Sequence, residues 1–185
     1  MTNPYSTPES NLQHDLSKGQ NDTSSPFSPN GRFGRYSFLA WNFVINILVM
    51  IIVMVVIGIA GASTDLLSMT DPTQAMAFYT SGVGLVAIAI MLVAFVFTII
   101  FFIRRLHDIN MSGWWSLLSI IPLVNLIFGI FVLVKKGTEG TNNFAPQRAT
   151  PTWEKIVGII ALIIIVLYVL VIIGAIVTAI MSGGM

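Results

Sequence analysis

The chain has 185 residues, of which 55% are hydrophobic and only 9% are charged, and its formal net charge is +1. About a quarter of the residues in an average soluble domain are charged, so this composition excludes an ordinary soluble globule. The sequence contains no cysteine, which excludes disulfides, thiolate catalysis and cysteine-ligated metals. We therefore expect an all-α integral membrane protein whose exterior is solvated largely by lipid.

The chain divides into three parts by composition. Residues 1–30 are polar and show no hydrophobic period, so they cannot bury enough apolar area to offset the entropy of ordering. We expect them to form a disordered tail. A membrane domain should follow over residues 31–150, with an additional C-terminal transmembrane helix within residues 151–185.

The start of the membrane domain carries two cations and two aromatic residues at helical spacing. Arg32 and Arg35 are three residues apart, and so are Phe33 and Tyr36. Such a pattern is typical of an anchor at the lipid headgroup level that fixes topology. A specific anionic-lipid site is the sharper alternative.

Three apolar segments are long enough to cross a membrane: Phe38–Ala62, Gly82–Ile103 and Ile156–Ile180. At 1.5 Å per residue, about 22 to 25 helical residues span the hydrocarbon core of ~30 Å. Asn42 and Asn46 share one face of the first span, where their amides need partners. Hydrogen bonding to another helix is one interpretation, and lining a polar cavity is the other.

The loop between the first two spans, Ser63–Ser81, contains Asp65 and Asp71 but no lysine or arginine. Asp71 precedes Pro72, an order that is typical of a helix start with an aspartate N-cap. The absence of cations makes this loop the best candidate for the outward-facing side.

The segment Trp114–Val134 allows two topologies because Pro122 lies near its middle, with Asn125 shortly after. A full crossing would place four cations on each side of the membrane. A re-entrant helical hairpin broken at Pro122 would instead place all eight on the cytoplasmic side, with the N-terminus, in agreement with the positive-inside rule. We therefore favour three full transmembrane helices plus a re-entrant hairpin over a fourth spanning segment. The eight cations are Arg32, Arg35, Arg104, Arg105, Lys135, Lys136, Arg148 and Lys155.

A cluster of ionisable residues follows the second span directly. Asp108 lies four residues after Arg104 and three after Arg105, so either arginine could pair with it on a helix. His107 has a side chain whose pKa normally lies near neutrality. The simplest interpretation is a topological stop with an internal salt bridge. On the hairpin topology these residues would join a cytoplasmic collar of cations and interfacial tryptophans: Arg32, Arg35, Arg104, Arg105, His107, Asp108, Trp114, Trp115, Lys135 and Lys136.

Several separated motifs resemble a bacterial inner-membrane family known as domain of unknown function 805. They are Gly31–Phe38, the core Arg104–Asp108, Ser112–Trp115, Leu118–Pro122 and the closing Gly137–Pro146. The resemblance implies a multi-pass location in the bacterial inner membrane and this architecture, but no reaction.

The sequence departs from the family pattern in two places. Asn143 and Ala145 stand where the family usually has arginine and glycine, which puts an anion-binding role of this loop in doubt. The last span lies beyond the usual extent of the family.

Three functions compete. The first is a non-enzymatic protein whose collar engages anionic lipid or a membrane partner, and the second is a small-solute transporter or channel component built around Asn42, Asn46, Pro122 and Asn125. Catalysis is third, because neither another histidine nor an acidic pair near His107 in the sequence completes a site around it. We expect no cofactor, metal or nucleic acid, and we expect membrane lipid as a partner, with homo-oligomers as a further option.

Overall fold

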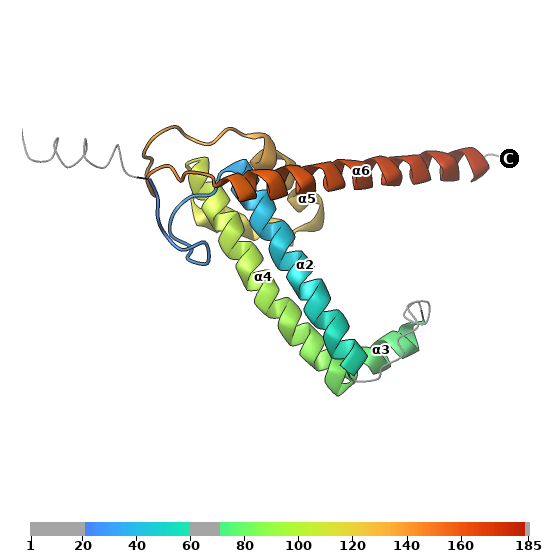
Figure 1. Ribbon diagram of the computed structural model, residues 1–185. Helices are drawn as coiled ribbons and strands as arrows, with labels where there is room; N and C mark the ends of the chain where they lie inside the picture. The colour runs from blue at the N-terminus through green and yellow to red at the C-terminus, as the bar shows by residue number, and fades with distance from the viewer. Residues whose placement is uncertain (1–20, 60–70, 184–185) are drawn as a thin grey trace, which may run out of the picture.

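The computed structural model describes residues 21–59 and 71–183, which are helical with connecting loops and contain no β-strand. The elements are the α-helices α2 (Arg35–Ile59), α3 (Pro72–Thr80), α4 (Gly82–Asp108), α5 (Pro122–Val134) and α6 (Thr152–Gly183), and the 3-10 helix η2 (Gly113–Ile120). Figure 1 shows how they are arranged. Three of them, α2, α4 and α6, are long and apolar enough to cross a membrane. The protein is therefore an all-α integral membrane protein, as its composition predicts.

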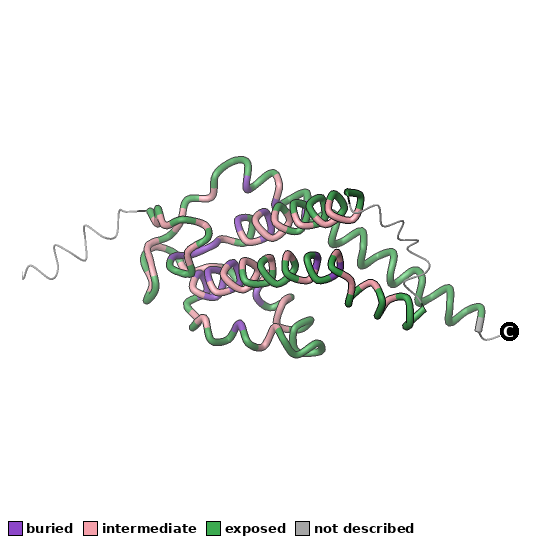
Figure 2. The backbone as a smooth tube through the Cα atoms, turned by 90° about the horizontal axis from the view of Figure 1, so that it is seen from below, coloured by how far each residue is buried: buried purple, intermediate pink, exposed green. Residues whose placement is uncertain are grey.

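Helices α2 and α4 form a long pair that lies side by side (Figure 1). They contain 25 and 27 residues, so each is about 37–40 Å long and can span the hydrocarbon core. The apolar core is concentrated where α2 begins and α4 ends. There Phe102, Leu106, Ile109 and Val132 are buried, with Phe38 packed against them. Figure 2 shows that much of the buried backbone lies toward this end of the pair.

Helix α6 joins this pair only through its first turns. Gly158 packs directly on the backbone of Tyr36, and Ala161 is buried. From Leu162 onward the described side chains are exposed, and the helix diverges from α2 and α4 (Figure 1). A helix that is apolar all round is stable in this position because lipid solvates it.

Helix α4 ends in a sharp turn that starts the hairpin. Asn110 adopts a left-handed conformation with φ of 59°. The amide of Met111 donates to the carbonyl of Leu106, and the amide of Asn110 donates to that of His107, at 2.9 and 3.1 Å. This pattern of hydrogen bonds is a Schellman motif, which closes the helix and reverses the chain.

The segment after this turn is a two-armed hairpin broken at Pro122. Its arms, η2 and α5, contain 8 and 13 residues and pack against each other. Pro122 is the first residue of α5, where its missing N–H and fixed φ are tolerated. The end of α5 lies beside the end of α4, where the Arg105 guanidinium donates to the carbonyls of Val132 and Lys135. Both ends of the hairpin therefore lie at the same end of the α2–α4 pair.

The predicted helix start at Asp71 is confirmed. Asp71 is the N-cap of α3 and accepts a hydrogen bond from the amide of Thr73 at 2.9 Å. Ser81 then caps α4, accepting from the amide of Gly84 at 3.1 Å. Asp65, like residues 60–62 of the first predicted span, lies outside the described residues.

The tail expected over residues 1–30 does not extend over residues 21–30. That stretch folds as a loop against the end of α4, where Ser25, Ser28 and Asn30 present their carbonyls to Arg104. The ring of Phe27 also packs on aromatic rings of α2 and α4, those of Trp41, Phe97 and Phe101. Composition could not reveal this, because the loop is held by contacts with residues distant in sequence. Residues 1–20 lie outside the described part of the chain.

We predict that Gly158→Ala weakens the contact between α2 and α6. A Cβ at this position would lie 2.6 Å from the carbonyl oxygen of Tyr36 and 2.9 Å from its Cα. Because both atoms belong to backbone, the helices must separate, at a cost of about 1–3 kcal/mol. Thermal unfolding in detergent should show a lower midpoint.

Gly174→Ala is the matched control, since nothing lies within 4 Å of a Cβ there. Alanine is the better helix former, so this variant should match the native protein or exceed its stability. Equal midpoints for both variants would contradict the close packing of α6 on α2.

Candidate functional site

The most unusual feature of the structure is a carboxylate shared by two buried arginines. The Oδ1 atom of Asp108 accepts from Arg32 Nη2 at 3.0 Å and from Arg32 Nε at 3.2 Å, while its Oδ2 atom accepts from Arg105 Nη1. Both arginine side chains have no exposed surface, and that of Asp108 is 9% exposed. Burying a charge is costly unless it is paired and hydrogen-bonded, and here both conditions are met.

The remaining donors of the two arginines hold the neighbouring backbone. Arg32 donates to the carbonyls of Thr138, Gly140 and Ala145 in the loop after α5. Arg105 donates to the carbonyls of Val132 and Lys135 at the end of α5. These last carbonyls of a helix lack intrahelical partners and carry partial negative charge, so a cation there is favourable.

The loop after α5 fits against Asp108 only because residue 137 is glycine. A Cβ on Gly137 would lie 2.1 Å from Oδ2 of Asp108. The amide and hydroxyl of Thr138 also donate to the Asp108 carbonyl, at 2.8 and 2.9 Å. The backbone and the carboxylate of Asp108 therefore both fix this loop.

Arg104 points away from Asp108 and holds the loop of residues 21–30. Its Nη1 donates to carbonyls of that loop, and its Nη2 lies 3.3 Å from Oδ2 of Asp22. Its guanidinium also lies over the ring of Phe33, 4.4 Å from the centroid. Burial alone raises the pKa of Asp22, but hydrogen bonds from Ser24 and from the Arg32 amide, with the charge of Arg104, bring it below its usual range.

A further ion pair, at the start of α6, is hydrogen-bonded to α2. Arg148 Nη1 and Nη2 donate to the two carboxylate oxygens of Glu154, each at 2.7 Å. Glu154 also accepts from Trp41 Nε1 at 2.9 Å, and Arg148 donates to Ser37 Oγ at 3.1 Å. Such a bidentate pair is among the strongest hydrogen-bonded arrangements in proteins.

His107 is occupied by a structural contact. Its ring stacks on Phe144, with centroids 4.1 Å apart and planes inclined by 4°. Its Nδ1 lies 3.3 Å from the carbonyl oxygen of Gly31. Because consecutive helical residues project about 100° apart, the adjacent residues Arg104 and Arg105 meet different segments, the loop of residues 21–30 and the end of α5.

Residues 26–146 match the model of a family described as "Protein of unknown function (DUF805)". The match covers more than half of the chain. The chain belongs to the DUF805 family.

Two curated relatives share part of the family region. Inner membrane protein YhaH of Escherichia coli strain K12 is 43% identical over 44 residues, and the protein of the same name from Escherichia coli O157:H7 matches equally. The aligned residues are 24% of this chain and 36% of either relative, so the chain matches about a third of their length. No solved structure matches. The descriptions of the family and of these relatives name no catalytic activity.

The DUF805 region contains the Asp108 cluster, whose prediction is partly confirmed. The ion pair between Arg105 and Asp108 forms as expected. The alternative pair of Arg104 with Asp108 does not form, because Arg104 faces the loop of residues 21–30 and pairs with Asp22. The second partner of Asp108 is Arg32, which is distant in sequence.

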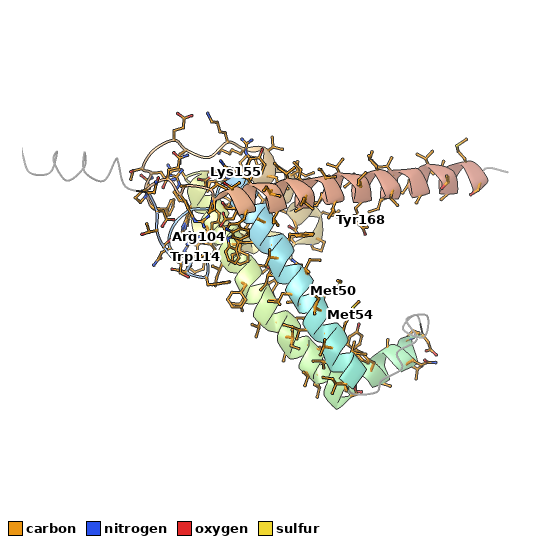
Figure 3. The ribbon with its side chains drawn as sticks, in the orientation of Figure 1. Met50, Met54, Arg104, Trp114, Lys155 and Tyr168 are labelled. Atoms are coloured by element: carbon orange, nitrogen blue, oxygen red, sulfur yellow. The ribbon has the colours of Figure 1, made fainter. Side chains whose placement is uncertain are left out.

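The predicted collar requires a correction. Arg32, Arg104 and Arg105 are fully buried, so they cannot face lipid headgroups as the collar interpretation assumes. Arg35, Lys135 and Lys136 are exposed, as are Trp114 and Trp115 on η2. Figure 3 shows Arg104, Trp114 and Lys155 at the same end of the molecule, away from Met50 and Met54 on α2.

The polar residues expected within the membrane hydrogen-bond locally. Asn42 Nδ2 donates to the Phe38 carbonyl at 2.8 Å, and Asn46 Nδ2 donates to the Asn42 carbonyl at 2.7 Å. Both bonds lie within α2 rather than between helices. Asn125 is exposed on α5, and among the described residues no hydrogen bond joins it to Asn42 or Asn46.

Sequence reasoning missed three members of this site. Asp22 lies in a polar stretch that gives no local signal. Glu154 could have been noticed, because it is an isolated carboxylate at the start of an apolar span, where a charge needs a partner. Gly137 is the first residue of the closing family motif, Gly137–Pro146. Its role depends on a close contact with Asp108 that only the fold reveals.

We predict that Asp108→Asn destabilises the fold strongly. The variant leaves two buried guanidiniums without a counter-charge, and breaking a buried ion pair in this way typically costs about 3–5 kcal/mol. Thermal unfolding monitored by size-exclusion chromatography in detergent should show a large loss of folded protein.

Glu139→Gln removes another carboxylate at the same end and serves as the control. Glu139 pairs with Lys136, but both side chains are more than three-quarters exposed, so this variant should unfold like the native protein. Native-like unfolding of Asp108→Asn would show that the shared carboxylate is dispensable.

Proposed function

We propose that this DUF805 protein is a multi-pass protein of the bacterial inner membrane whose cytoplasmic basic end binds anionic lipid headgroups without catalysing a reaction. The relatives are named inner membrane proteins, which supports the location. The charge distribution supports the orientation, with the N-terminus in the cytoplasm. Eight cations and four carboxylates lie at one end of the described helices. At the other end, Asp71 is the only charged side chain among the described residues. The positive-inside rule places such a basic end in the cytoplasm.

The observation that carries the lipid proposal is a difference between two groups of cations. We call them the inner cations (Arg32, Arg104, Arg105 and Arg148) and the outer cations (Arg35, Lys135 and Lys155). Arg32, Arg104, Arg105 and Arg148 each pair with a carboxylate. Among the described residues, the exposed cations Arg35, Lys135 and Lys155 have no carboxylate partner. Their charge is left for an external anion, and each basic side chain near an anionic surface contributes about 1 kcal/mol.

Exposed aromatic side chains at the same end support contact with the headgroup region. Trp114 is 81% exposed, and Trp115 and Trp153 are about half exposed. Tryptophan and tyrosine are enriched at the membrane interface, where an amphipathic ring meets both lipid and water. These residues favour a position of the basic end at the level of the lipid phosphates.

A catalytic role has less support than lipid binding. Both oxygens of Asp108 are taken by arginines, and His107 is stacked on Phe144. The described residues contain no group of three acidic or histidine side chains that could hold a metal. A transport function likewise lacks a specific observation in its favour, because the Nδ2 atoms of Asn42 and Asn46 donate within α2 rather than to another helix.

The proposal is tested with brominated lipids that quench tryptophan fluorescence. We expect brominated phosphatidylglycerol to quench the native protein at lower mole fraction than brominated phosphatidylcholine does. In the variant Arg35→Gln/Lys135→Gln/Lys155→Gln this preference should fall by roughly fivefold per substitution. All three side chains are exposed, so the thermal midpoint should be retained.

A native protein that is quenched equally by both lipids would overturn the proposal. Lipid preference retained in full by the triple variant would show that the preference does not arise from these cations.

A further inference from the structure

A polar cavity lies beside the Asp108 cluster, at the N-terminus of α2. Its volume is about 250 Å³, several times the roughly 30 Å³ that a water molecule occupies in the liquid. Three basic side chains from three segments line it: Arg35 from α2, Lys136 from the loop after α5, and Arg148 from the segment before α6. The side chains of Thr150 and Gln147 add a hydroxyl and an amide to the lining.

Arg35 is the cation of this cavity whose charge is least satisfied. Its Nε donates to the Lys135 carbonyl at 3.3 Å. Its terminal nitrogens have no hydrogen-bond partner among the described residues, and no carboxylate pairs with it. By contrast, Arg148 is held by Glu154 through two hydrogen bonds. Arg35 therefore presents two free donor groups and a full positive charge.

The start of α2 lines the same cavity. Gly34, Arg35 and Tyr36 line it, and the first hydrogen bond of the helix runs from the Phe38 amide to the Gly34 carbonyl at 2.9 Å. The N–H groups before Phe38 have no partner within the helix, and the helix N-terminus carries partial positive charge. Together with Arg35 they form a surface that favours an anion.

The two carboxylates of the cavity do not cancel this charge. Asp108 is already shared by Arg32 and Arg105. Glu139 pairs with Lys136 at 2.6 Å on an exposed edge, with both side chains more than three-quarters exposed. An anion that enters the cavity would thus compete with Glu139 for Lys136, and exposed pairs of this kind are weak.

We propose that this cavity binds a phosphate group, held by Arg35 and Lys136 and by the first amides of α2. The lipid form of the ligand rests on the proposed function, because it requires the cavity to face headgroups. Tyr36 in its lining and Trp153 nearby on α6 mark the level of the interface. Glu139 sets the affinity by holding Lys136 when the cavity is empty.

Two substitutions test the site with opposite signs. We use protein in a non-ionic maltoside detergent and measure the binding of inorganic phosphate by calorimetry. Arg35→Gln should weaken binding by roughly tenfold or more, because it removes charge-assisted hydrogen bonds. Glu139→Gln should strengthen binding by roughly two- to fivefold, because it frees Lys136. A gain of affinity cannot result from misfolding.

The matched controls keep the charge at each position. Arg35→Lys should bind more tightly than Arg35→Gln, and Glu139→Asp should remain close to the native protein. If neither Arg35→Gln nor Glu139→Gln changes phosphate binding, or if the native protein binds no phosphate, the site is overturned.

A second arm identifies the source of the phosphate. Brominated phosphatidylglycerol is added to the same micelles, and quenching is measured with and without inorganic phosphate. Quenching that follows the two substitutions and is competed by phosphate assigns the site to a lipid headgroup. Phosphate binding that follows the substitutions, without any preference for phosphatidylglycerol over phosphatidylcholine, supports the site with free phosphate as its ligand and overturns only the proposed lipid function.

Discussion

The fold depends on one buried carboxylate, that of Asp108, which neutralises Arg32 and Arg105 together. Through these arginines it connects the start of α2, the end of α5 and the loop around Gly140. The two guanidiniums exceed the one carboxylate in charge, and the backbone carbonyls around them supply the remaining negative potential. Such a network is costly to bury and stable only when complete, so it imposes one arrangement on the segments it joins.

Charge at this end of the molecule is divided between an inner and an outer layer. The inner arginines are paired with Asp108, Asp22 and Glu154 and hold the chain together. The outer cations Arg35, Lys135 and Lys155 lack carboxylate partners among the described residues, and one of them, Arg35, lines a polar cavity. The inner layer thus builds a scaffold that presents the outer layer, whose charge is the physical basis of the proposed binding of anionic headgroups.

Sequence patterns predicted the local features of this structure and missed the long-range ones. Hydrophobic length located the spans, Pro122 located the break in the hairpin, and helical spacing narrowed the partner of Asp108 to Arg104 or Arg105, of which Arg105 forms the pair. These features depend on residues close in sequence. The burial of Arg32 and the pairing of Arg104 with Asp22 depend on segments about 80 residues apart. No periodicity shows whether an arginine beside a span faces lipid or the interior.

The most direct test of the account is the accessibility of single cysteines in intact cells, since the chain contains no cysteine of its own. Exposed positions are substituted as Thr23→Cys, Gln74→Cys, Ala149→Cys and Ser182→Cys. A hairpin that returns to the cytoplasmic end predicts that a membrane-impermeant reagent labels positions 74 and 182, and reaches 23 and 149 only after lysis. Labelling of position 149 with protection of 182 would mean that residues 109–135 cross the membrane, and would contradict the single basic end on which the account rests.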